Sequence, residues 1–135
     1  MREGKKVAVV ACAGMDKALG SVARASVFRA VEVLRPEKTE LVCLPPALTG
    51  VAPHAEWMKR LPVITVDGCA ERCATKLVVK NGGKVRGRVL IPVSAQKHDL
   101  MPETASNIGP IGQKLVERVA EEVAAIVDRL TKEGA

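Results

Sequence analysis

Four cysteines are the residues of this chain with the clearest capacity for chemistry: Cys12, Cys43, Cys69 and Cys73. Deprotonated thiols are soft ligands, and four of them in a tetrahedron suit zinc, which needs no redox chemistry. Four cysteines also suit an iron–sulfur cluster, which ranks second to zinc here. Alternatively, Cys69 and Cys73 form a redox pair while the other thiols are small core residues, an interpretation that suits Cys43 best.

Other residues near the cysteines have simpler interpretations. His54 and His98 are expected in loops and could act as alternative ligands, although four cysteines make neither necessary. Asp67 is expected to accept hydrogen bonds from backbone N–H groups at the start of the following helix, rather than to act as a catalytic acid. Gly68 is expected where the backbone turns sharply or approaches a neighbour closely, near the metal.

Phosphate-binding loops are not indicated after the first strand. Gly14 and Gly20 flank that loop, but neither G-x-G-x-x-G nor G-x-x-x-x-G-K-[ST] is present. In a phosphatase-like C-x₅-R loop counted from Cys12, the arginine position is occupied by Ala18.

The elements that must position the cysteines alternate between strand and helix. Strands are predicted at residues 6–11, 39–44 and 62–66 and within 87–93, where Pro92 favours an edge position or an early end. Helices are predicted at residues 16–34, near 54–60, at 69–80 and at 110–132. This alternation predicts one three-layer α/β domain over residues 1–135, with right-handed crossovers and a mostly parallel sheet of about four strands. The expected strand order is 2-1-3-4, as in flavodoxin- or Rossmann-like sheets.

On this frame the cysteines converge at one edge of the sheet. Cys12 follows the first strand, Cys43 ends the second, and Cys69 follows the third, with Cys73 one helical turn further on. Carboxyl ends of parallel strands meet at the same edge, where open α/β sheets bind their ligands. A helix beginning at Cys69 would point its positive end at the thiols, which favours the thiolate form.

The residues around the cysteines resemble the DGC-domain family, which is regarded as a zinc-binding family. The resemblance rests on Cys12-Ala13-Gly14, on a cysteine in the second strand, and on Asp67-Gly68-Cys69 followed by Cys73-Ala74 and Lys76. It covers most of the chain, and it implies that Cys12, Cys43, Cys69 and Cys73 chelate the metal. Arg72 and Lys76 either offset the thiolate charge or form the solvent-exposed face of the helix.

Composition narrows the class of partner. The net charge is +6, but basic residues are scattered and the chain has one Trp, one Phe and no Tyr. We therefore expect no specific nucleic-acid binding, because few aromatic rings can stack on bases.

No apolar run is long enough for a membrane span, and no secretory signal is visible, so we expect a cytoplasmic protein whose thiols stay reduced.

Three functions follow, of which a zinc-binding or accessory module is favoured. Four thiolates complete a tetrahedral shell and leave no open position for Lewis-acid catalysis, so an enzyme is not favoured. The alternatives are a thiol redox protein or enzyme using Cys69 and Cys73, and a nucleic-acid-binding accessory domain using the basic surface.

Overall fold

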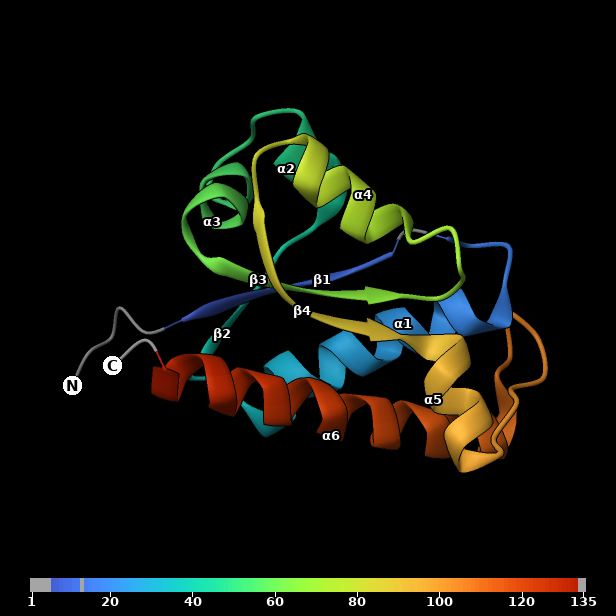
Figure 1. Ribbon diagram of the computed structural model, residues 1–135. Helices are drawn as coiled ribbons and strands as arrows, with labels where there is room; N and C mark the ends of the chain where they lie inside the picture. Colours follow the sequence, from blue (N-terminus) through green and yellow to red (C-terminus); the bar gives the residue numbers. More distant parts are fainter. Residues whose placement is uncertain (1–5, 13, 134–135) are drawn as a thin grey trace.

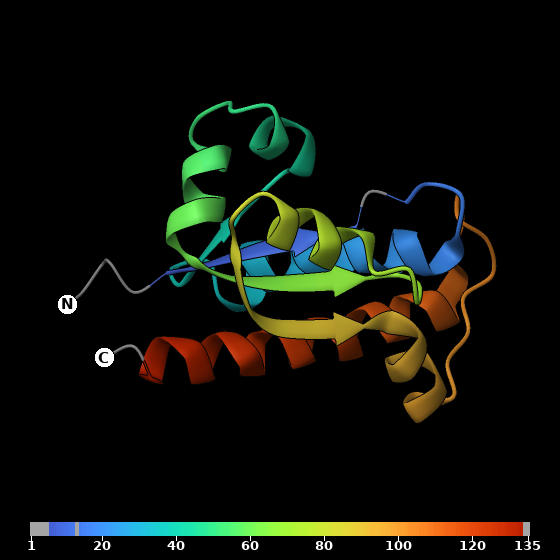
Figure 2. The ribbon, with the colours of Figure 1, turned by 45° about the horizontal axis from the view of Figure 1, so that its top comes forward.

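The computed structural model describes residues 6–12 and 14–133 of the chain, and within them the predicted α/β class is confirmed. Four strands form one parallel sheet in the predicted order, β2-β1-β3-β4. The strands are β1 (Val7–Ala11), β2 (Thr39–Leu41), β3 (Pro62–Asp67) and β4 (Lys84–Leu90). Their arrows point the same way, so the loops after them gather at one end of the molecule (Figure 2).

Helices cover both faces of the sheet (Figure 1). One face carries α1 (Ala18–Arg29), its π-helical continuation η1 (Ala30–Leu34), α5 (Ile91–His98) and α6 (Gly109–Glu133). The other carries α2 (Leu44–Leu48), α3 (His54–Arg60) and α4 (Cys73–Lys80). Two layers of helices on one sheet give the three-layer arrangement expected from the sequence.

The central strand β1 explains why there are two cores. Val7 and Val9 pack into the core under α1 and α6, whereas Ala8 and Val10 pack into the core under α2, α3 and α4. Successive side chains of a strand point to opposite faces, so a strand covered on both sides must be apolar throughout. All four of these side chains are buried.

The last helix confirms its prediction to within one residue at each end. Leu115, Val119 and Val123 of α6 are buried against the sheet, while Ile111 in its first turn is 48% exposed.

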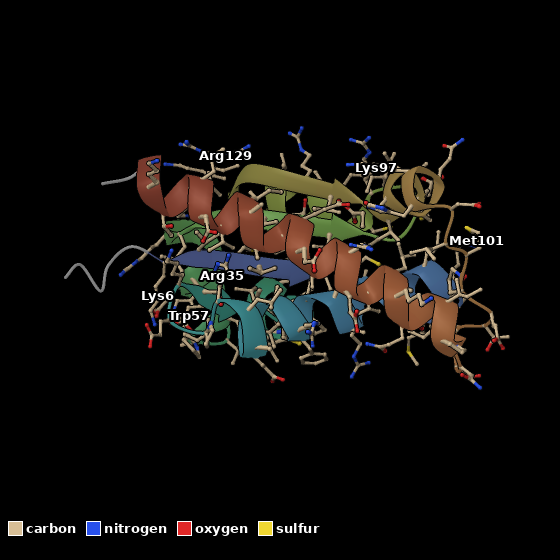
Figure 3. All side chains as sticks on the ribbon, turned by 90° about the horizontal axis from the view of Figure 1, so that it is seen from below. Lys6, Arg35, Trp57, Lys97, Met101 and Arg129 are labelled. Carbon is tan, nitrogen blue, oxygen red and sulfur yellow. The ribbon has the colours of Figure 1, made fainter. Side chains whose placement is uncertain are left out.

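Towards the carboxyl end of α6, Asp128 accepts two hydrogen bonds of 2.7 Å from the guanidinium of Arg35. Figure 3 shows Arg35 beside the crossing of α6 over the sheet. These hydrogen bonds lower the pKa of Asp128 from 3.8 to about 2.

Two helices, α2 and α5, were not predicted, and both begin with prolines that were expected at the ends of strands. Pro45 and Pro46 stand in the first turn of α2, and Pro92 stands in the first turn of α5. Proline is tolerated there because the first N–H groups of a helix have no partners within it. Pro92 therefore ends β4 early at Leu90, and β4 lies at the sheet edge, as expected.

Three boundaries also move. β2 ends at Leu41 instead of residue 44, β4 begins at Lys84 instead of Gly87, and α1 begins at Ala18 instead of residue 16. Among the described residues, no helix combines the length and apolar composition that a membrane span requires.

Candidate metal centre

Cys12 follows β1 directly and is held beside β3. Its backbone N–H donates a hydrogen bond of 2.9 Å to the carbonyl of Val66, which extends the pairing of the two strands by one residue. The side chain is half-buried at the carboxyl edge of the sheet, where the sequence placed it. Ala13, part of the motif after this strand, lies outside the described residues.

Cys43 departs from the prediction, because it lies beyond the second strand. Its backbone is extended immediately before α2, and its side chain is exposed. The interpretation of Cys43 as a small core residue is therefore wrong. The apolar character of this stretch instead serves its neighbours Val42 and Leu44, which are 3% and 4% exposed.

His54 holds the backbone of Cys43 in place. It is the first residue of α3, not a loop residue, and its Nδ1 accepts a hydrogen bond of 3.2 Å from the Cys43 N–H. The ring also meets Trp57 edge-on, with 5.5 Å between ring centroids. Because Nδ1 accepts this bond, a neutral ring carries its proton on Nε2 and offers no free lone pair to a metal. His54 thus positions the Cys43 loop.

Cys12 and Cys43 line the same pocket, which has a volume of about 700 Å³. The pocket lies between the ends of β1 and β2 and one side of α1, from its first turn to its last. Its apolar walls include Met15, Val27, Phe28, Leu41, Val42, Leu44 and Pro45. The structure therefore brings two of the four predicted ligands to one cavity.

The rim of this pocket is tied to a distant part of the chain. Ser21 of α1 donates a hydrogen bond of 2.5 Å to the carbonyl of Ala105, in the loop between α5 and α6. On the same helix the guanidinium of Arg24 lies 5.7 Å from the ring centre of Phe28. The hydrogen bond between Ser21 and Ala105 joins residues 84 positions apart, so no local pattern could have predicted it.

The β3–α4 loop, residues 68–72, carries Cys69 and leads into Cys73, and its conformation corrects the predicted helix 69–80. The backbone of Arg72 is left-handed, with φ of 55°, and its N–H closes a turn by donating to the carbonyl of Cys69 at 3.1 Å. A right-handed helix does not pass through such a residue, so α4 begins at Cys73. Cys69 is half-buried in the loop, and Cys73 is exposed at the positive end of the helix.

Asp67 confirms its predicted role as a helix cap. It is only 3% exposed, and its Oδ1 accepts a hydrogen bond of 2.8 Å from the N–H of Ala74. Its Oδ2 accepts from the N–H and the hydroxyl of Thr75, at 3.4 and 2.6 Å. The carboxylate at the end of β3 therefore fixes where α4, and with it Cys73, begins.

Glycines bring the β1–α1 and β3–α4 loops together. A Cβ on Gly68 would lie 2.8 Å from the backbone nitrogen of Gly20 and 2.9 Å from the carbonyl carbon of Leu19. A Cβ on Gly20 would in turn meet the carbonyl oxygen of Gly14. The close backbone approach expected at Gly68 is thus confirmed, and its partner is the start of α1.

The four thiols fall into two groups by position. Cys12 and Cys43 line one pocket, while Cys69 lies in the loop that packs on α1 through Gly68 and Cys73 lies at the start of α4. Within the described parts of the chain, no three His, Cys, Asp or Glu side chains lie close enough together to hold a metal ion. The donor chemistry fits zinc, but the present positions would have to close further to form one coordination sphere.

The remaining candidates lie outside this centre. Lys76 forms an exposed ion pair of 3.7 Å with Glu71. His98 is the last residue of α5, and its Nε2 lies 3.4 Å from Glu122 of α6, which also accepts a 2.8 Å hydrogen bond from Ser94. The four-residue spacing of Ser94 and His98 indicates this shared face only once α5 is recognised as a helix.

Comparison with known proteins identifies one protein family. Residues 8–123 match the family described as DGC domain. The matched range contains all four cysteines, the strands β2, β3 and β4, and all of β1 except Val7. Neither the curated proteins nor the solved structures include a significant match.

Proposed function

Because the chain belongs to the DGC-domain family, we propose that it binds one zinc ion through the thiolates of Cys12, Cys43, Cys69 and Cys73. The observation that carries this proposal is positional. All four cysteines are free, and they follow the adjacent strands β2, β1 and β3 at one edge of the sheet. Four soft donors gathered at the ligand-binding edge of an α/β sheet suit a tetrahedral zinc site.

Zinc binding would be coupled to movement of the loops. The thiols stand as two groups, so a shared ion requires the segment from Cys69 to Cys73 to approach the pocket of Cys12 and Cys43. Contact of Gly68 with Gly20 already holds the loops backbone to backbone, which leaves side-chain rotation and small loop shifts for the closure. Binding that orders the loops would stabilise the folded state.

The proposed role is binding rather than catalysis. Four thiolates fill the coordination sphere and leave no position for a substrate or an activated water. We place the protein in the cytoplasm, because free thiols persist where the compartment is reducing. An iron–sulfur cluster is the competing occupant of the same cysteines.

A second function, thiol–disulfide exchange by Cys69 and Cys73, is favoured because no three metal-ligating side chains gather among the described residues. Cys69 lies in the loop that leads into α4, and Cys73 is exposed at the first position of that helix. In the exchange, Cys69 and Cys73 would lose two protons and two electrons to form a disulfide, and a partner disulfide would gain them as two thiols.

Elemental analysis of protein purified under reducing conditions tests the proposal. We expect about one zinc per chain, with loss of the metal in the Cys→Ser variant of each of the four positions. His98→Ala is the matched control, because His98 lies at the end of α5 beside Glu122, away from the cysteines, and it should retain the zinc. A strong chelator should lower the melting temperature.

The same measurements separate the alternatives. Zinc retained after replacement of Cys12 or Cys43 would contradict a four-cysteine site. Iron with acid-labile sulfide would identify a cluster. Metal-free protein that rapidly forms a Cys69–Cys73 disulfide would identify the redox function.

A further inference from the structure

We propose that a second pocket, beside the β3–α4 loop, binds a small molecule through an oxyanion group, either phosphate or carboxylate. The pocket has a volume of about 390 Å³ and lies at the carboxyl ends of β3 and β4. Its lining includes the arginines Arg72 and Arg88 and the apolar residues Leu90 and Val93. No cysteine lines it, so this proposal does not depend on zinc binding.

The two arginines are the observation that carries the inference. Arg72 precedes α4, and Arg88 is an exposed residue of the edge strand β4. Among the described residues, neither guanidinium has an ion-pair or hydrogen-bond partner. Two unpaired guanidiniums on one cavity provide planar pairs of donors, which match the oxygens of a carboxylate or phosphate.

The two carboxylates of the pocket are already engaged elsewhere. Asp67 directs both oxygens to the first turn of α4. Glu122 accepts the hydrogen bond from Ser94 and lies beside His98. They reduce the positive potential without occupying the arginines, so recognition would rest on directed hydrogen bonds rather than on net charge.

The start of α5 lies beside the same cavity. No side chain caps this helix, and Pro92 in its first turn has no N–H. The N–H of Val93 is therefore without a capping partner, in a residue that lines the pocket. Figure 2 shows the end of β4 leading directly into α5 at this edge of the sheet. Positive helix ends favour anions.

The size and lining of the pocket indicate the rest of the ligand. A volume of about 390 Å³ is within the range of pockets for small organic molecules and exceeds what one inorganic ion fills. Leu90 and Val93 add apolar surface to the same lining. A compact organic acid or phosphorylated metabolite fits this combination.

Titrations with inorganic phosphate and with acetate, at constant ionic strength and followed by ¹H–¹⁵N NMR of the full chain, test the proposal. We expect saturable shifts centred on residues 72–75 and 88–94 with at least one probe, and the tighter probe identifies the headgroup. Arg72→Asn keeps a residue that tolerates left-handed backbone, and Arg88→Gln keeps the length of the strand side chain. Each should weaken binding by about fivefold or more.

Arg86→Gln is the matched control, because Arg86 is exposed on the same strand but does not line the pocket. Its affinity should stay within about twofold of the unsubstituted protein. Equal weakening by Arg86→Gln would show diffuse charge attraction and overturn the site, as would the absence of saturation with both probes. In the metal-free protein, Cys43→Ser should leave oxyanion binding intact, whereas it should abolish zinc binding, which separates the two proposals.

Discussion

The contact between Gly68 and Gly20 makes a sharp prediction, because a single methyl group at position 68 has no room. A Cβ there would lie 2.8 Å from the nitrogen and 2.9 Å from the Cα of Gly20, and 2.9 Å from the carbonyl carbon of Leu19. All three atoms belong to the backbone of α1, so no side-chain rotation relieves the overlap. Gly68→Ala should force the β3–α4 loop away from α1.

The cost follows from the missing space. Ordinary carbon contacts begin near 3.4 Å, so the loop must retreat by about 0.5 Å along its contact with a packed helix. Insertions of this kind cost about 1–3 kcal/mol. The backbone of Gly68 is not left-handed, so the alanine also restricts the unfolded chain, which returns about 0.4–1 kcal/mol. We expect a net loss of about 1–2 kcal/mol.

Urea unfolding, followed by far-ultraviolet circular dichroism and by fluorescence of the single Trp57, measures this loss. Gly14→Ala is the matched control in the neighbouring loop, because its methyl group would meet nothing nearer than 3.8 Å. It should be neutral or slightly stabilising. A Gly68→Ala protein as stable as the Gly14→Ala protein would refute the reasoning that steric contact joins these loops.

Two further predictions concern carboxylates. Asp67→Asn should destabilise the fold by about 1–3 kcal/mol in urea unfolding, because an amide nitrogen would face the donors of Thr75, and the exposed Asp16→Asn should change it by less than about 0.5 kcal/mol. Equal stability of the two variants would contradict a capping role for Asp67. Because the pKa of Asp128 is lowered to about 2, its pairing with Arg35 should stabilise the fold above about pH 4 and lose this effect as the pH falls towards 2. Asp128 is 44% exposed, so Asp128→Asn should cost at most about 1 kcal/mol at neutral pH, and a cost independent of pH would contradict the assignment.

The sheet could be predicted because its information is local and repeated. The continuous apolar run of β1 and the apolar stripe along α6 each predict, without reference to the rest of the chain, which of their residues are buried. The alternation of strands and helices then restricts the possible strand orders. The starts of the helices could not be predicted in the same way. The start of α4 depends on a carboxylate seven residues before Ala74 and on the left-handed backbone of Arg72, neither of which interrupts the helical pattern of residues 69–80.

The candidate site shows the same division. Parallel topology was sufficient to bring every cysteine to one edge, but the distances between thiols depend on loop contacts. Pairing of Cys43 with His54 through a backbone N–H, and packing of Gly68 on Gly20, arise between segments far apart in the sequence. Residue types therefore predicted the possible ligands, while their division into two groups required the structure.

The division between sheet and loops also bears on how the two proposed sites would behave. The oxyanion pocket is lined by the ends of β3 and β4, the first turns of α4 and α5, Glu122 of α6 and, from the β3–α4 loop, Arg72. Three of the thiols belong to loops and Cys73 begins α4, so a shared metal would have to supply the free energy that closes these segments. Zinc should therefore raise the stability of the β1–α1 and β3–α4 loops in particular, whereas an oxyanion should bind the metal-free protein.

Because Arg72 belongs to the same loop as Cys69, closing that loop around a metal would also shift one of the two guanidiniums of the oxyanion pocket. The two sites would then be coupled through one segment, with each ligand altering the affinity for the other by the same factor.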